Sequence, residues 1–122
     1  VGETVWLEDE RLMDPVTAVS GSGPAYVFWF IEQMAEAGTA LGLAPQDARR
    51  LALATVLGAA RLAAQSDEAP GTLRERVTSK GGTTEAALRV FADERLAERL
   101  RRAIEAASRR GAELGDLLGG DD

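Results

Sequence analysis

Apolar residues recur along this chain at the three- and four-residue spacing of α-helices. In the last third, after Asp93, they form a stripe with i, i+4 and i+8 spacing, which predicts one long amphipathic helix. Its members are Leu96, Leu100, Ile104, Ala107 and Leu114. Between Tyr26 and Ile31 every position is apolar, so we expect a helix whose N-terminal half is buried on all sides.

Proline and glycine residues mark where these helices begin and end. Pro24 suits the first turn of a helix capped by Ser22 or Gly23, and Gly42 suits its end. A second helix is expected to begin at Pro45. The five predicted helices cover about residues 24–41, 45–64, 72–77, 83–93 and 94–114.

Two of the predicted helix ends depend on a single local signal. Thr72 and Glu75 have the spacing of a capping box, which predicts the start of a short helix that runs through Val77. Leu114 and the glycine after it are expected to close the last helix.

The fold class follows from composition as well: 22 residues are Ala and 15 are Leu, whereas Val and Ile together number ten. The apolar content consists of helix formers, so the chain is predicted to be all-α.

The chain divides into three predicted regions. Residues 1–15 combine one short strand-like piece with an acidic run, which indicates either a frayed terminus or the remnant of a junction with an upstream domain. Residues 16–114 are expected to form the helical domain. Residues 115–122 are expected to be a disordered acidic tail.

Composition excludes several functions. The net charge is −6 and the chain has neither His nor Cys, which rules out imidazole or thiolate metal sites, disulfides and catalytic triads within it. Neither half carries the basic stripe typical of nucleic-acid binding, and no 18-residue apolar window suggests a membrane span. We therefore expect a cytoplasmic protein with no metal, no nucleic-acid partner and no membrane partner. Its chemistry must use hydroxyls, carboxylates, backbone amides, arginines or the single lysine, Lys80.

Two glycine- and hydroxyl-rich segments are candidates for that chemistry. Residues 20–24 and 78–84 are both predicted to be loops that precede helix starts, where backbone amides and the helix dipole favour anions. In both cases the alternative is that they are only caps and turns. The second loop is the stronger candidate because it combines four hydroxyls, one cation and two glycines that allow close approach to a ligand.

Other polar clusters are better explained as solvated surface. Glu32 and Glu36 lie four residues apart on a helix that is expected to have one solvent-exposed face. The arginines of the last helix alternate with acidic residues, which predicts an exposed, salt-bridged face. Tyr26 is expected in the core, with its hydroxyl bonded to one partner.

The pattern also predicts a partner subunit. A 122-residue helical monomer cannot easily surround a helix that is apolar on every side. Five of the nine residues at 52–60 are Ala or Gly, which allows close approach of another helix. A second copy of the chain would supply the missing cover.

Two motifs carry a family resemblance. The run from Asp14 to Tyr26 and the run from Arg76 to Thr84, joined by the alanine-rich residues 55–60, resemble the C-terminal half of pyrroline-5-carboxylate reductase. The likeness extends from about Val5 to Leu114. It implies an enzyme that reduces 1-pyrroline-5-carboxylate to L-proline, in which an all-helical domain forms an interlocked homodimer. Assembly of such dimers into a higher oligomer stays open.

The resemblance also implies roles for residues of both segments. Substrate binding would fall to Ser79, Gly81, Gly82, Thr83 and Thr84, with the amides of the last three on the carboxylate and the Thr84 hydroxyl near the imine nitrogen as the catalytic group. The nicotinamide end of the cofactor would face Thr17, Ser20, Gly21, Ser22 and Gly23. One departure is Lys80, which stands where the family usually has proline.

The cofactor implied is NADPH or NADH, held in the complete enzyme by an N-terminal Rossmann domain that this chain lacks. We therefore expect the chain alone to bind no nucleotide. Two alternatives remain at this point. One is the helical domain of a hydroxyacid-type dehydrogenase, although those enzymes use a lysine within a helix. The other is a non-enzymatic helical dimerisation module, in which both glycine segments are caps.

Overall fold

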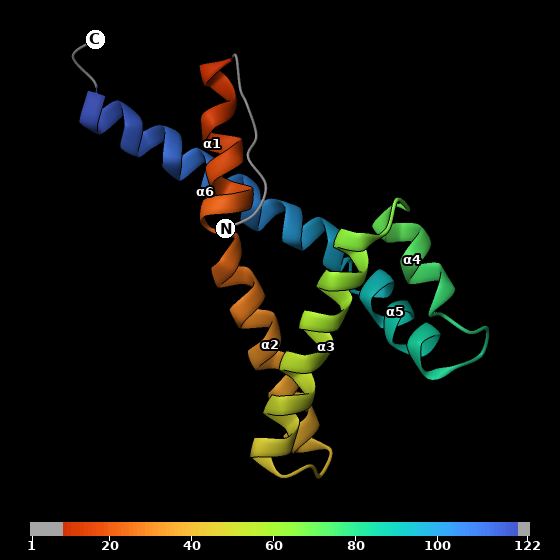
Figure 1. The fold of residues 1–122 in the computed structure, drawn as a ribbon. Helices are drawn as coiled ribbons and strands as arrows, with labels where there is room; N and C mark the ends of the chain where they lie inside the picture. Colours follow the sequence, from red (N-terminus) through yellow and green to blue (C-terminus); the bar gives the residue numbers. More distant parts are fainter. Residues whose placement is uncertain (1–8, 120–122) are drawn as a thin grey trace. The chain divides into compact units, whose positions relative to one another are not determined.

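The computed structural model describes residues 9–119, and every regular element among them is helical (Figure 1). This confirms the all-α prediction. The elements in chain order are η1 (Glu10–Leu12), α1 (Met13–Val16), η2 (Thr17–Gly21), α2 (Gly23–Ala40), α3 (Pro45–Gln65), α4 (Pro70–Arg76), α5 (Thr83–Asp93) and α6 (Leu96–Gly119). The strand-like piece predicted near the N-terminus lies outside the described residues.

The chain separates into two compact units, which are described one at a time. The first contains the described residues up to Tyr26 together with those from Arg95 onward, and the second runs from Val27 to Glu94. The helix α2 contributes its first four residues to the first unit and the remainder to the second.

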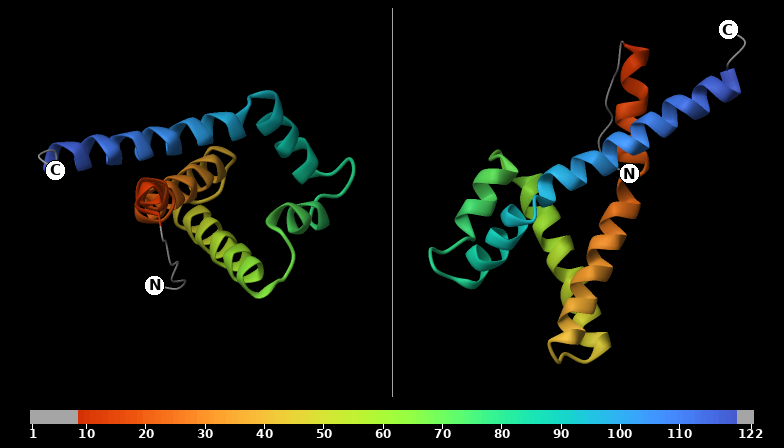
Figure 2. Two further views of the ribbon diagram at one scale, coloured as in Figure 1. Left: turned by 90° about the horizontal axis from the view of Figure 1, so that it is seen from above. Right: turned by 180° about the vertical axis from the view of Figure 1, so that it is seen from behind.

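In the first unit, α1 and η2 pack against α6, as two views of the ribbon show (Figures 1 and 2). Within the described residues, the first helical residue is Glu10, ahead of the predicted start of the helical domain at residue 16. Asp9 caps this start, because its carboxylate accepts a hydrogen bond of 2.9 Å from the amide of Arg11. The side-chain and backbone hydrogen bonds from Arg11 also lower the pKa of the Asp9 carboxyl.

The last helix is longer than predicted. Closure at Gly115 and disorder over 115–122 were wrong for the described part, because α6 continues through Gly115 to Gly119. A helix interior tolerates glycine at a cost of about 1 kcal/mol, and Leu117 and Leu118 extend the apolar stripe at i+3 and i+4 from Leu114. The predicted charged face is confirmed at Arg110, which pairs with Glu113 at 2.9 Å.

In the second unit, α2 and α3 form a hairpin joined by residues 41–44 (Figure 1). Gly42 has a φ of +114°, and the amides of Gly42 and Leu43 donate to the carbonyls of Thr39 and Gly38 at 3.0 Å each. This bond pair is a Schellman motif, which satisfies the last carbonyls of α2. Gly42 therefore ends the helix as predicted.

Close packing in the hairpin centres on Gly38. A Cβ atom at this position would lie 3.2 Å from both the Ala48 Cβ and the Leu43 Cδ1. Ala48 and Ala52, one turn apart on α3, are 3% and 4% exposed. Small residues on both helices thus set the contact next to the turn.

The start of α4 differs from the prediction. The capping box at Thr72 and Glu75 was wrong, because α4 begins at Pro70 with Ala69 as its N-cap and with no side-chain cap. Proline is preorganised for the first helical position, and it holds the residue before it in an extended conformation, here with a ψ of 149°.

Candidate functional site

The second predicted loop lies between the end of α4 at Arg76 and the start of α5 at Thr83. Its first part is tied to α4. The hydroxyl of Thr78 donates to the Arg74 carbonyl at 2.6 Å, and its amide donates to the Glu75 carbonyl at 3.1 Å. Thr78 thus closes the preceding helix, and the residues open to a ligand begin at Ser79.

Ser79 to Gly82 form a tight turn. The amide of Gly82 donates to the Ser79 carbonyl at 3.0 Å. Gly81 has a φ of +77°, in the left-handed region that favours glycine. A Cβ on Gly82 would lie 3.3 Å from the Ser79 carbonyl oxygen. The Gly82 amide, which the resemblance assigns to the substrate carboxylate, is therefore already used inside the turn.

The glycine turn leads directly into the start of α5. Gly82 occupies the N-cap position in an extended conformation and makes no side-chain cap. Within the described residues, no hydrogen bond reaches the amides of Thr83 and Thr84, which stand at the first two helical positions. These are two of the unpaired donors that every helix start carries, and the helix dipole makes their surroundings favourable to an anion.

The two threonine side chains differ in exposure. Thr83 is exposed and Thr84 is half-buried, and neither hydroxyl has a hydrogen-bond partner in the described part of the chain. Lys80 is exposed in the turn rather than within a helix, and residues 9–119 contain no ion pair that involves it. The loop thus combines two amides, two hydroxyls and one cation over five residues.

One functional candidate was missed from the sequence. Glu85 accepts a hydrogen bond of 3.1 Å from the Gly81 amide through Oε1, and the same oxygen lies 3.4 Å from Arg89 Nη2. Glu85 stands at the third helical position of α5, where a glutamate can bond to an amide ahead of its own helix. The signal that could have found it is the Gly82-x-x-Glu85 spacing at a predicted helix start.

The first predicted loop, residues 20–24, is not a loop. Residues 17–21 form the π-helical turn η2, and the Ser22 amide donates to the Thr17 carbonyl at 2.8 Å. Pro24 has no amide hydrogen, so the regular α-helical ladder cannot pass through it and the register changes on its N-terminal side. Tyr26 stabilises this turn, since its hydroxyl donates to the Ala18 carbonyl at 2.7 Å, which confirms the single predicted partner.

This helical conformation changes what the first segment offers a ligand. Thr17, Ser20 and Gly21 are exposed, whereas Ser22 and Gly23 are half-buried. The Ser22 amide is spent on the π-helical bond. The segment therefore presents the hydroxyls of Thr17 and Ser20 rather than an open cradle of amides.

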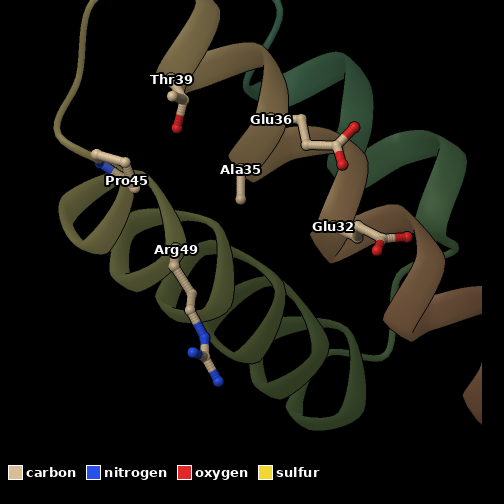
Figure 3. A pocket seen from close by; sticks show the side chains of 6 residues that line it. All are labelled: Glu32, Ala35, Glu36, Thr39, Pro45 and Arg49. Carbon is tan, nitrogen blue, oxygen red and sulfur yellow. The ribbon is translucent and has the colours of Figure 1, made fainter.

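A shallow groove of about 420 Å³ lies on the α2–α3 hairpin, away from both segments in sequence (Figure 3). Its lining residues are Glu32, Ala35, Glu36, Thr39, Pro45 and Arg49. Figure 3 shows the Arg49 side chain running along α3 rather than toward the two carboxylates. No ion pair joins these charges among the described residues, in line with the prediction of a solvated face.

Comparison with known proteins decides which family carries these two motifs. The model of the pyrroline-5-carboxylate reductase dimerisation family matches residues 10–114. The chain belongs to this family. The match begins where helical structure begins, at Glu10, and includes both glycine-containing segments.

Individual pyrroline-5-carboxylate reductases agree with the family match. The chain is 50% identical over 119 residues to the reductase of Pseudomonas aeruginosa, covering 98% of this chain and 44% of that protein. The structure of the reductase from Coxiella burnetii matches with a TM-score of 0.89 and 43% identity, over 93% of this chain and 42% of that one. The structure from Plasmodium falciparum, solved with NADP bound, matches with a TM-score of 0.84 and 34% identity, over 88% and 41%.

These figures also set the extent of the match. The chain spans less than half the length of the pyrroline-5-carboxylate reductases it resembles. Among residues 9–119, no helix has both the length and the apolar character that crossing a membrane requires.

Proposed function

We propose that this chain is the dimerisation and substrate-binding part of an enzyme that reduces 1-pyrroline-5-carboxylate to L-proline with NADPH or NADH. Membership of the pyrroline-5-carboxylate reductase dimerisation family supports this activity. The observation that carries it is the pair of unpaired amides on Thr83 and Thr84, at the start of an 11-residue helix directly after a glycine turn.

The substrate carboxylate is assigned to these two amides. An anion at this position gains two hydrogen bonds and the favourable end of the α5 dipole. Gly82 contributes by having no side chain, which leaves the backbone approachable, while its own amide stays bonded to Ser79. Ser79 and Gly81 are thus binding residues through the shape of the turn.

Thr84 is assigned to the reacting end of the substrate. In the reaction a hydride adds to the imine carbon, the C=N double bond becomes single, and the nitrogen takes one proton overall. A carboxylate on the Thr83 and Thr84 amides puts the adjoining ring close to the Thr84 hydroxyl, which is half-buried and unbonded within the described residues. Its role is to hold the nitrogen, or a water beside it, by a hydrogen bond while the charge on nitrogen changes.

The described residues fit only one end of the nucleotide. Every regular element among them is helical, and they contain no strand-helix-strand unit of the kind that holds a dinucleotide. The exposed hydroxyls of Thr17 and Ser20 and the small residues 21–23 suit contact with the nicotinamide end. When bound, the nucleotide supplies the hydride, and the chain's own contribution is to orient the two reactants.

We also propose that the active form contains two copies of the chain. Among the described residues only Ala18, Ala48 and Ala52 are buried. Phe28 and Trp29, in the apolar stretch of α2, are 69% and 57% exposed. Large apolar side chains in such numbers on a surface indicate that a partner covers them, and a dimerisation family supports a second copy of the chain as that partner.

The activity is tested with the complete reductase that carries this chain. Purified protein is mixed with 1-pyrroline-5-carboxylate and either NADPH or NADH, and nucleotide oxidation is followed at 340 nm alongside the formation of proline. We expect substrate-dependent oxidation with one of the nucleotides. Oxidation that does not depend on the substrate, or none with either nucleotide, would contradict the proposal.

A further inference from the structure

Glu85 ties the glycine turn to the first turn of α5. Its Oε1 accepts the Gly81 amide at 3.1 Å and lies 3.4 Å from Arg89 Nη2, one helical turn further on. The side chain is half-buried, with 35% of its surface exposed. A single carboxylate oxygen therefore connects the turn, the helix start and a cation on the same helix.

This contact is a second restraint on the turn, beside the hydrogen bond from the Gly82 amide to the Ser79 carbonyl. Residues 81 and 82 are both glycine, the residue with the widest choice of backbone conformations. Gly81 is in the left-handed region, at a φ of +77°, and nothing lies within 4 Å of where its Cβ would be. Side-chain packing cannot hold such a residue, so the hydrogen bond from its amide to Glu85 is what orients the peptide between Lys80 and Gly81.

We propose that Glu85 is a positioning residue for the substrate carboxylate. By holding the Gly81 amide, it keeps the turn in the conformation from which the Thr83 and Thr84 amides point outward together. Glu85 does not touch the substrate in this account. The inference rests on the proposed function, because it presumes that those two amides bind the carboxylate.

Because Glu85 is charged, the electrostatic and the positioning explanations predict opposite changes in substrate binding when it is removed. A carboxylate near an anion site repels the anion, so electrostatics alone predicts that removing Glu85 strengthens substrate binding. A positioning role predicts weaker substrate binding, because the turn loses the hydrogen bond from the Gly81 amide to Glu85. Exposed ion pairs contribute little, so the contact with Arg89 should matter less than the bond to Gly81.

The experiment uses steady-state kinetics of the complete reductase with three variants. Glu85→Ala removes the acceptor and the charge, Glu85→Gln keeps an acceptor oxygen without the charge, and Arg89→Gln is the matched control that removes only the ion pair. For Glu85→Ala we expect the KM for 1-pyrroline-5-carboxylate to rise about three- to tenfold, the size of one hydrogen bond. We expect the KM of the other two variants to stay within about twofold of the parent, and the KM for the nucleotide to be unchanged in all three.

Several outcomes would overturn the inference. A lower or unchanged substrate KM in Glu85→Ala would do so, as would an equal rise in Glu85→Gln, because that variant keeps an acceptor oxygen for the Gly81 amide. Hydrogen exchange adds a readout without activity: the Gly81 amide should exchange faster in Glu85→Ala than in Glu85→Gln. A parent protein that is inactive with 1-pyrroline-5-carboxylate would overturn the proposed function itself, whereas an active parent with an unmoved KM would overturn only the role of Glu85.

Discussion

Gly111 in α6 faces the carboxylate of Asp14 in α1 so closely that a Cβ on the glycine would lie 2.9 Å from Asp14 Oδ1. Real Cβ atoms essentially never approach another atom to this distance, so the absence of a side chain permits the contact between the two helices. Gly115, one turn further along α6, has nothing within 4 Å of its Cβ position. Gly111 is therefore required for a close contact between helices, whereas Gly115 in the same helix is not.

Alanine substitutions should separate these two glycines. Glycine in a helix interior costs about 1 kcal/mol relative to alanine, so Gly115→Ala should stabilise the fold by up to about that amount. Gly111→Ala should fail to show this gain or should destabilise, because Asp14 must move. Chemical denaturation at one fixed protein concentration measures both.

An Asp14→Ala background is the control for the Gly111 prediction. With the carboxylate removed, Gly111→Ala should recover the gain seen at Gly115, which a double-mutant cycle would report as coupling between the two sites. Equal stabilisation by both glycine substitutions in the parent background would show that the close contact has no energetic consequence.

The Tyr26 hydroxyl should contribute measurably to stability. It donates to the carbonyl of Ala18, a residue of the π-helical turn that is only 1% exposed. Tyr26→Phe leaves that carbonyl without this donor, at an expected cost of about 1 to 2 kcal/mol. The matched control is Thr55→Val, which removes an exposed hydroxyl bonded to the Leu51 carbonyl at 2.7 Å and should change stability by less than about 0.5 kcal/mol. Equal losses in the two variants would count against a special role for Tyr26.

Thr84→Val in the complete reductase should impair catalysis more than Thr83→Val. The valine keeps the shape and removes the proposed bond to the imine nitrogen, at a cost of roughly 1.5 to 3 kcal/mol for a charge-assisted interaction. The corresponding loss in kcat/KM is about 10- to 150-fold. Thr83→Val keeps the amide that binds the carboxylate, so its effect should be smaller. If Thr84→Val retains more than about half of the parental kcat/KM with an unchanged melting temperature, the hydroxyl has no part in the reaction.

The chain should be a dimer in solution. Covering the exposed apolar side chains of α2 supplies the burial that three buried alanines cannot. Light scattering at micromolar concentration should give about twice the chain mass of 12.9 kDa. A well-folded species with the mass of one chain would contradict this expectation.

The positions of most helices were predictable because their signals are local. Pro45 and Gly42 marked a helix start and a helix end that need no tertiary information. The failures involve competition between two local signals or the continuation of a helix. Pro70 outweighed the capping box at Thr72, and the leucines after Gly115 continued a helix that the glycine alone was expected to stop.

The candidate site was predictable in part for the same reason. The glycine turn and the start of α5 at Thr83 follow from the sequence. Two hydrogen bonds were not predictable: the Gly82 amide donates to the Ser79 carbonyl, and the Gly81 amide donates to Glu85. Both depend on backbone geometry that residue types alone do not reveal. Residues 20 and 21 were misjudged because hydroxyl and glycine residues favour loops, whereas the Tyr26–Ala18 bond helps a π-helical turn to form there.

The most direct test of the account is the crystal structure of the complete reductase with L-proline bound. The measured quantity is the distance from each carboxylate oxygen of proline to the backbone nitrogens of residues 79–84. The account predicts that both Thr83 and Thr84 amides lie within hydrogen-bond distance, about 2.7 to 3.2 Å, with the proline nitrogen facing the Thr84 hydroxyl. Proline bound with its carboxylate on other groups, and these two amides left to water, would contradict it.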